Sequence, residues 1–296
     1  MQSKKVNIIK RIVDAVLTVL LLFIMAYQVT GEKLHEWLGA AMTLIVIGHH
    51  ILNYKWYKSL FKGKYTPYRI ALTATDILLL AAFAVTALNG MSMSGHAVPF
   101  MYGTINAMTA RKLHLTVSYW AFTLMGLHIG LHLRTMTAKI KAPAAVKTTA
   151  AALFAAAAAW GGSLFFKGDI INYMLYKTHF AFFDYQKAKW LVVVENIAML
   201  LCWTFVGYIL TRLLQKHKNK AELLKPLIWL AAVAAAAAVL IFAMKDKNDN
   251  STSSSWQSAP APQAAVQISQ AQTSSENSQA ANGQSAANDG FFAYKL

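Results

Sequence analysis

The chain has 296 residues, of which 56% are hydrophobic and only 14% are charged, a composition that excludes an ordinary soluble domain and favours a membrane protein. The formal net charge of +16 does not indicate nucleic-acid binding, because the basic residues stand between apolar runs rather than in a basic soluble module. The single cysteine, Cys202, excludes an internal disulfide, a Cys-x-x-Cys-His haem attachment and a cysteine-ligated iron–sulfur cluster.

Apolar runs predict an all-α integral membrane protein with about seven transmembrane helices, because a helix needs about 20 apolar residues to cross a bilayer. The runs lie near 12–29, 34–54, 70–88, 112–133, 148–166, 190–211 and 226–244. The first run is long and has no Ala-x-Ala-like site after it. We therefore expect it to remain as a membrane anchor and not to be cleaved as a signal peptide.

Lys and Arg residues gather in alternate connections. They are frequent in the N-terminal segment and in the second, fourth and sixth connections, as Lys4, Lys5, Lys10, Arg11, Lys55, Lys58, Lys62, Lys64, Arg69, Arg134, Lys139, Lys141, Lys147, Arg212, Lys216, Lys218, Lys220 and Lys225. By the positive-inside rule, the N-terminus is predicted to be cytoplasmic and the C-terminal tail extracytoplasmic.

One histidine pattern occurs twice. LHEWLGAAMTLIVIGH at 34–49 is echoed by LHLTVSYWAFTLMGLH at 113–128, so each helix carries Leu-His, thirteen further residues and a second His. An interval of this length ends about 40° short of four helical turns and rises about 21 Å, which puts both histidines on one face near opposite sides of the bilayer core. The two predicted spans run in the same direction, and therefore His35 is expected opposite His114 on the outer side and His49 opposite His128 on the inner side.

Histidines at matched depths on parallel helices predict two haem groups, because polar side chains at membrane depth are costly and haem iron commonly takes axial histidine. With both axial positions filled, electron transfer is the expected chemistry. Small residues near the histidines would admit a bulky group, namely Gly39, Ser118, Gly48 and Gly126. Arg111 and Arg134 would face the anionic propionates, although small and basic residues also serve ordinary helix packing and interfacial anchoring.

Two further histidines leave the ligand set open. His132 lies one turn beyond His128, and His50 is about 100° around the helix from His49. Either is an alternative ligand, and His132 would otherwise hold a propionate or a quinone. We prefer His49 with His128 because only equal intervals keep the two levels matched. The loop histidines, which are His96, His179 and His217, are expected to be solvated or structural.

The motifs resemble known families. The His-x13-His helices resemble those of cytochrome b in bc-type quinol-oxidising complexes. HEWLG, HHILN-x-x-W, GKYTP, the Leu-His, Tyr-Trp and Leu-His-x-Gly-Leu-His elements, and FAFFDY are similar to the flavinylation-associated membrane cytochromes. These motifs stand at 35–39, 49–56, 63–67, 113–114, 119–120, 127–132 and 180–185, and the resemblance covers about 1–212.

The resemblance implies a haem b subunit that passes electrons across the bacterial inner (plasma) membrane. Its expected partners are the lipid bilayer, membrane quinone or quinol, and an extracytoplasmic FMN-bearing protein. The tail after Met244 is rich in Ser, Ala, Gln and Asn and has no flavinylation threonine motif. We therefore expect the tail to be disordered and any flavin to belong to another chain.

Three parts are predicted: a haem-binding four-helix bundle at 1–134, three further helices at 135–245 with an aromatic extracytoplasmic loop at 167–189, and the tail at 246–296. Polar residues in or near the loop would take protons from a quinol or would belong to an aromatic belt at the membrane surface. These residues are His179, Asp184, Glu195 and Asn196. For the intramembrane acids Asp14 and Asp76, structural pairing is expected.

Two other functions stay open. The intramembrane histidines would suit a divalent-metal transporter, since imidazole binds zinc, copper and nickel. That function predicts carboxylates or thiols near the histidines, broken helices at the midplane and an internal repeat. The third possibility is a haem-free membrane anchor subunit that binds a partner through its loops and tail.

Overall fold

The computed structural model describes residues 2–138, 141–178 and 180–216, and within these ranges every regular element is a helix. The chain divides into two compact units, Met1–Phe242 and Ala243–Leu296, and all the described residues belong to the first. The long helices are α1 (Gln2–Met25), α2 (Tyr27–Leu52), α4 (Pro67–Met93), α5 (Ala107–Thr137), α6 (Ala144–Lys167) and α8 (Lys189–Lys216). The short ones are α3 (Lys55–Ser59), η1 (Pro99–Met101) and α7 (Ile170–Met174).

Local sequence explains where the central helices begin. The Thr66 side chain accepts a hydrogen bond from the Arg69 N–H at the start of α4, and Pro67 follows as the first helical residue, where its missing N–H is not needed. At the start of α5, the Asn106 side chain accepts hydrogen bonds from the N–H groups of Met108 and Thr109.

The first two helices meet earlier than the sequence pattern predicts. The apolar runs place the connection after residue 29, whereas α1 ends at Met25 and α2 begins at Tyr27, with a bend of 120° between them. Ala26, at the break, has non-helical backbone angles and is buried. Within α2, Gly31 has φ +68°, which glycine adopts without a Cβ penalty. Hydrophobicity did not locate this turn because apolar residues continue through it.

The helices are of the kind that cross membranes. Three of them, α4, α6 and α8, are long and apolar enough by length and composition, and the bent pair α1 and α2 adds a fourth candidate if it is counted as one span. Large apolar side chains point outward along the helices, as in Leu44 at 70% and Leu153 at 67% exposure. Such exposed apolar surface is costly in water and normal against lipid. The chain therefore has the helices of a membrane protein.

The prediction of seven spans is confirmed only in part. The runs at 70–88, 148–166 and 190–211 lie inside the helices α4, α6 and α8. The run at 112–133 lies inside α5, which is long but is not among the helices apolar enough to qualify alone. The last predicted span, 226–244, and the predicted tail lie outside the described residues.

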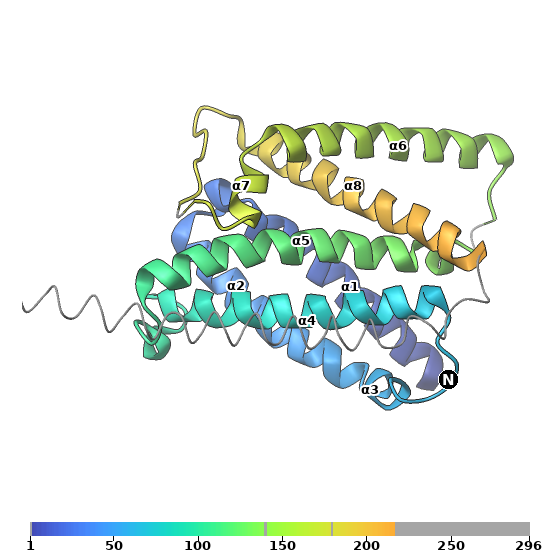
Figure 1. Cartoon of the computed structure of the whole chain (residues 1–296), viewed down its shortest axis with the longest axis horizontal. Helices are drawn as coiled ribbons and strands as arrows, with labels where there is room; N and C mark the ends of the chain where they lie inside the picture. The colour runs from blue at the N-terminus through green and yellow to red at the C-terminus, as the bar shows by residue number, and fades with distance from the viewer. Residues whose placement is uncertain (1, 139–140, 179, 217–296) are drawn as a thin grey trace, which may run out of the picture. The chain divides into compact units, whose positions relative to one another are not determined.

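The long helices pack in a defined order. Figure 1 shows, within this unit, α6 beside α8, and α5 between α8 and α4. Along α5 and α8 the backbones come close at glycines: a Cβ on Gly130 would meet the Thr204 carbonyl oxygen and the Gly207 Cα, and a Cβ on Gly207 would lie 2.5 Å from the Leu127 carbonyl oxygen. Small residues permit this approach, which strengthens packing between apolar helices.

The helix α7 and the apolar side chains around it join the second half of this unit to α5. The Thr116 hydroxyl donates to the Tyr173 carbonyl at 2.8 Å, and the Trp120 indole donates to the Met174 carbonyl at 3.0 Å. The core beneath is apolar and includes the fully buried Phe122. The start of α5 is thus fixed relative to the aromatic connection that follows α7.

Contacts at the ends of α4 establish the direction of its neighbours. Glu36, near the start of α2, accepts a hydrogen bond of 2.8 Å from Ser94, just beyond the end of α4. His114, near the start of α5, donates a hydrogen bond of 2.9 Å to the carbonyl oxygen of Thr86, which is also near the end of α4. Both α2 and α5 therefore run opposite to α4 and parallel to each other, as the histidine pattern requires.

Candidate haem or metal site between α2 and α5

Two histidine pairs lie on the parallel helices α2 and α5. We call His35 with His114 the outer pair and His49 with His128 the inner pair, after the orientation predicted from the sequence. The backbones of α2 and α5 are not among the closely packed helix pairs, so side chains and not backbone contacts face each other here. All four side chains are only partly buried in the chain alone.

The outer pair comes together across the two helices. The imidazole centroids of His35 and His114 are 5.9 Å apart, with their planes at 76°. His35 Nδ1 lies 3.1 Å from the carbonyl oxygen of Ile24, and His114 Nδ1 lies 2.9 Å from that of Thr86. A carbonyl only accepts, so both Nδ1 atoms carry the proton and both Nε2 atoms keep a free lone pair.

The surroundings hold the outer rings in place. Gly90 on α4 gives His114 its room, because a Cβ there would lie 2.9 Å from His114 Cε1. Tyr27 packs edge-on against His35 with ring centroids 5.1 Å apart, and its other side stacks on Phe183 at 5.4 Å. The connection between α7 and α8 therefore contacts the outer pair indirectly, because Phe183 packs on Tyr27 and Tyr27 packs on His35.

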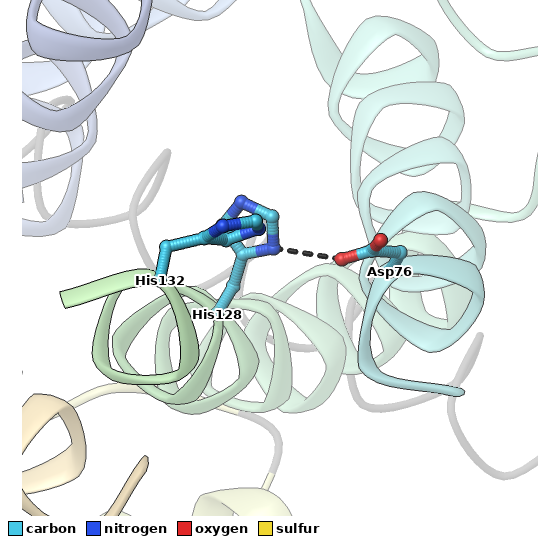
Figure 2. Close-up of side chains that lie close together, drawn as sticks. All are labelled: Asp76, His128 and His132. Atoms are coloured by element: carbon cyan, nitrogen blue, oxygen red, sulfur yellow. Dashed lines mark hydrogen bonds and ion pairs between the residues drawn. The ribbon is translucent and has the colours of Figure 1, made fainter. Parts of the chain in front are cut away.

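A carboxylate lies beside each histidine of the inner pair. Figure 2 shows His128 and His132 pointing from α5 to the same side and Asp76 reaching toward them from α4. His128 Nδ1 donates to Asp76 Oδ1 at 2.8 Å. His49 Nδ1 is 3.0 Å from Asp14 Oδ1, an ion-pair distance whose direction does not meet hydrogen-bond geometry.

The two halves of the site repeat one arrangement. In each antiparallel hairpin, α1 with α2 and α4 with α5, the first helix supplies oxygen atoms and the second supplies histidines. Ten positions separate Asp14 from Ile24 on α1, and ten separate Asp76 from Thr86 on α4. The outer histidine of each hairpin contacts the carbonyl and the inner histidine contacts the carboxylate. The repeat seen in the histidine spacing therefore extends to the groups behind the histidines.

The orientation of the rings leaves most Nε2 atoms free. Among the described residues, the Nε2 atoms of His35, His114 and His128 have no hydrogen-bond partner. His49 Nε2 has only the Asn53 amide, at 3.5 Å. Ligating histidines characteristically donate the other ring N–H to a carboxylate or a backbone carbonyl. The pattern of partners is therefore that of metal-ligating imidazoles.

The two alternative ligands have different surroundings. His50 is turned away to a tyrosine, because its Nδ1 lies 2.9 Å from the Tyr57 hydroxyl. The His132 ring contacts the His128 ring at a centroid distance of 4.8 Å. Ligand atoms of Asp76, His128 and His132 lie within 4.8 Å of one another and could hold a metal ion. The structure thus supplies a partner for His50 and leaves His132 beside the inner pair.

Small residues predicted to admit a cofactor fall into two groups. A Cβ on Gly39 or Gly48 would meet no heavy atom within 4 Å, so α2 has open space beside its histidines. Gly126 instead packs on α8, with a Cβ there 2.6 Å from Trp203 Cβ. Its role here is helix packing, which hydrophobic spacing alone does not distinguish. The Ser118 hydroxyl donates to the Leu115 carbonyl within its own helix.

The two predicted propionate partners have other contacts. The Arg111 guanidinium lies 5.2 Å above the Phe180 ring. Arg134 donates to the Gln215 side-chain oxygen, which joins the ends of α5 and α8. It lines a cavity of about 730 Å³ together with Thr66, Tyr68, Arg212, Leu213, Leu214 and Gln215. No contact ties either arginine to the histidine pairs within the described part of the chain.

Other polar residues have structural partners. Glu36 accepts hydrogen bonds from Ser94 and from the N–H groups of His96 and Ala97, which pins the loop after α4 to α2. Its carboxylate also forms with Glu32 and His96 a group whose ligand atoms lie within 4.8 Å of one another.

In the aromatic connection, Glu195 is paired with Lys187 at 2.9 Å, and Asp184 caps the N–H of Gln186. Asn196 is buried, and His179 and His217 lie outside the described residues.

The sequence did not predict the contacts that four residues, Asp14, Asp76, Tyr27 and Gly90, make with the histidines. Pairing was expected for Asp14 and Asp76, and it is found, but its partners are the inner histidines. The ten-residue interval that relates these acids to Ile24 and Thr86 was a usable signal only together with the register of each hairpin. Tyr27 and Gly90 carry no signal in the sequence, because their partners come from other elements.

Comparison with family models, curated proteins and solved structures finds no match for this chain.

Proposed function

We propose that the protein is a membrane b-type cytochrome that transfers electrons across the bilayer through two haem b groups. One haem would be held by His35 and His114 and the other by His49 and His128. The observation that carries this proposal is the repeated arrangement in which an oxygen atom lies at the Nδ1 of each of the four histidines on the two parallel helices.

The outer pair fits a metal centre of this kind. A metal ion held by both imidazoles would require the two rings to lie close together, because a metal–imidazole bond is only about 2 Å long. The observed centroid distance between His35 and His114 is 5.9 Å. Open space beside Gly39 and Gly48 is consistent with a bulky flat group on α2. The donor set, neutral imidazole, is one that haem iron takes.

The protein groups do three things for such a cofactor. The carbonyls of Ile24 and Thr86 and the carboxylate of Asp76 would fix the tautomer and orientation of three ligands, and the Asp14 carboxylate lies beside the fourth, His49. The aromatic rings of Tyr27 and Phe183 limit water access to the outer pair. Haem held by these histidines would supply one-electron redox chemistry.

The finer architecture belongs to the same proposal. The helices α1, α2, α4 and α5 would form the haem-binding four-helix bundle, and α6, α8 and the run at 226–244 would complete seven spans. The basic connections put the N-terminus and the inner pair on the cytoplasmic side. The membrane would be the bacterial inner membrane.

The partners are proposed from the resemblance in sequence motifs. A membrane quinol or a cytoplasmic donor would give electrons, and an extracytoplasmic FMN-bearing protein would receive them. Some support comes from the connection between α7 and α8, where large aromatic side chains such as Phe182 and Tyr185 are 77% and 73% exposed. Aromatic rings of this kind sit at membrane interfaces and in protein contacts.

A divalent-metal protein, including a transporter, is the second candidate. It is favoured by Asp76, His128 and His132, whose ligand atoms lie within 4.8 Å of one another. Carboxylates near the histidines and a repeated hairpin also meet two of the expectations for a transporter. Against it, Asp76 Oδ1 already accepts the Nδ1–H of His128, which makes Asp76 a support for His128 more than a ligand.

The test is a reduced-minus-oxidised absorption spectrum of the purified full-length protein, with a pyridine haemochrome assay and elemental analysis. We expect two haem b groups per chain and a b-type spectrum. A folded, haem-free preparation that contains stoichiometric zinc would support the metal-binding alternative, and one with neither haem nor metal would support a membrane anchor.

A further inference from the structure

The inner and outer pairs differ in the charge of the groups behind them. Neutral carbonyls of Ile24 and Thr86 face the outer histidines, whereas the carboxylates of Asp14 and Asp76 face the inner ones. We propose that Asp14 and Asp76 are positioning residues that lower the reduction potential at the inner pair below that at the outer pair. This inference rests on the proposed function, because it requires haem at both pairs.

The physical reason is the charge of the metal centre. The ferric centre carries one more positive charge than the ferrous centre, so a nearby negative charge favours the ferric form. A carboxylate that accepts the ligand N–H also makes the imidazole a stronger donor. Both effects act in the same direction, and a carbonyl dipole exerts them more weakly than a full charge does.

Burial and contact geometry determine which aspartate lowers the reduction potential at the inner pair more. The Asp76 side chain is 14% exposed and lies 2.8 Å from His128, whereas that of Asp14 is 53% exposed. Asp76 accepts a hydrogen bond from His128 Nδ1, whereas the contact of Asp14 with His49 lacks hydrogen-bond geometry, and a buried charge acts more strongly. We therefore expect the larger effect from Asp76.

Charges near the outer pair do not remove this difference. Arg111 and Lys112 precede His114 by three and two positions, and as cations they favour the reduced form on that side. Glu36 follows His35, but its carboxylate is turned to Ser94, to the N–H groups of His96 and Ala97 and to the His96 ring, and it has no hydrogen bond to His35 or His114. The outer pair therefore lacks a carboxylate behind either ligand.

A lower potential at the inner pair favours electron flow from the inner to the outer level. With haem bound at both pairs, the outer pair would gain each electron that the inner pair loses, and no proton or bond would be exchanged between them. A quinol-class donor on the inner side gives two electrons and two protons per molecule. A flavin-class acceptor outside takes two electrons and two protons, the latter from water on its own side.

The experiment compares Asp76→Asn and Asp14→Asn with the unaltered protein by spectroelectrochemical titration in lipid nanodiscs. Haem content is measured first, and His128→Ala identifies which midpoint belongs to the inner pair. We expect the lower midpoint to rise in both variants, more in Asp76→Asn, while the upper midpoint stays unchanged. Asp169→Asn, which removes a carboxylate from the connection between α6 and α7, is expected to move neither midpoint.

The outcomes separate this inference from the proposed function. No haem in the unaltered protein rejects the proposed function. Two haems whose midpoints stay in place in both aspartate variants reject only the role of Asp14 and Asp76, as does a lower midpoint assigned to the outer pair. If Asp76→Asn loses haem, Asp76→Glu keeps the charge and is expected to retain the low midpoint, and Asp14→Asn still measures the charge effect.

Discussion

At the residue scale, the group behind a histidine distinguishes a ligand from a neighbour. His128 and His132 lie one turn apart on α5 and their rings touch. Only His128 has a carboxylate at Nδ1, and no such oxygen partner is found for His132 within the described residues. Because support of this kind accompanies metal ligation, the geometry favours the histidine that keeps equal intervals.

Replacement of each histidine separately tests this choice. We expect His128→Ala to reduce the haem content from two per chain to one, because it removes a proposed haem ligand, and His132→Ala to retain both. The measurement is the pyridine haemochrome ratio with the low-temperature spectrum of each variant. Loss of one haem in His132→Ala with retention in His128→Ala would assign the inner ligand to His132 instead.

At the element scale, the sequence predicted the histidine-bearing helices but not their packing. Fourteen-residue intervals predicted faces and depths because helix geometry is fixed within one element. The contact between Asp14 and His49 depends on the register of two antiparallel helices, and that register follows a turn at Ala26 that hydrophobicity did not locate. The role of Gly126 was also not predictable from local sequence, because its partner Trp203 is on α8, which is far away in the sequence.

The seam between α5 and α8 gives a prediction at this scale. A methyl group on Gly130 would enter the backbone of α8 at Thr204 and Gly207, and backbone yields less easily than a flexible side chain. We expect Gly130→Ala to destabilise the protein by about 1–3 kcal/mol through overpacking. The measurement is thermal or denaturant unfolding in detergent.

The matched control for the seam is Gly162→Ala on α6. Its added methyl would meet only the Cys202 Sγ, at 3.3 Å, which belongs to a partly exposed side chain and not to backbone. A stability change in Gly130→Ala no larger than that in Gly162→Ala would show that close backbone packing at this seam is unimportant.

At the scale of the whole molecule, charge and helix direction agree with each other. The connection between α2 and α4 and the ends of α5 and α8 carry basic residues, including Lys62, Arg134 and Arg212. The helices α5 and α8 run parallel, so their C-terminal ends lie together, as the contact between Arg134 and Gln215 shows. The aromatic connection after α7 lies toward the other ends of these helices, beside the outer pair. The positive-inside rule would then place the aromatic connection outside.

Site-directed cysteine labelling tests this orientation. In a Cys202→Ser background, Tyr185→Cys in the aromatic connection and Lys62→Cys in the basic connection each place one thiol at an exposed position. We expect a membrane-impermeant maleimide to label Tyr185→Cys in intact spheroplasts and Lys62→Cys only after permeabilisation, because basic connections stay in the cytoplasm. The reverse labelling pattern would show that the protein has the opposite orientation. The pair His49 and His128 would then lie near the outer surface, and the charge of Asp14 and Asp76 would favour electron flow inward.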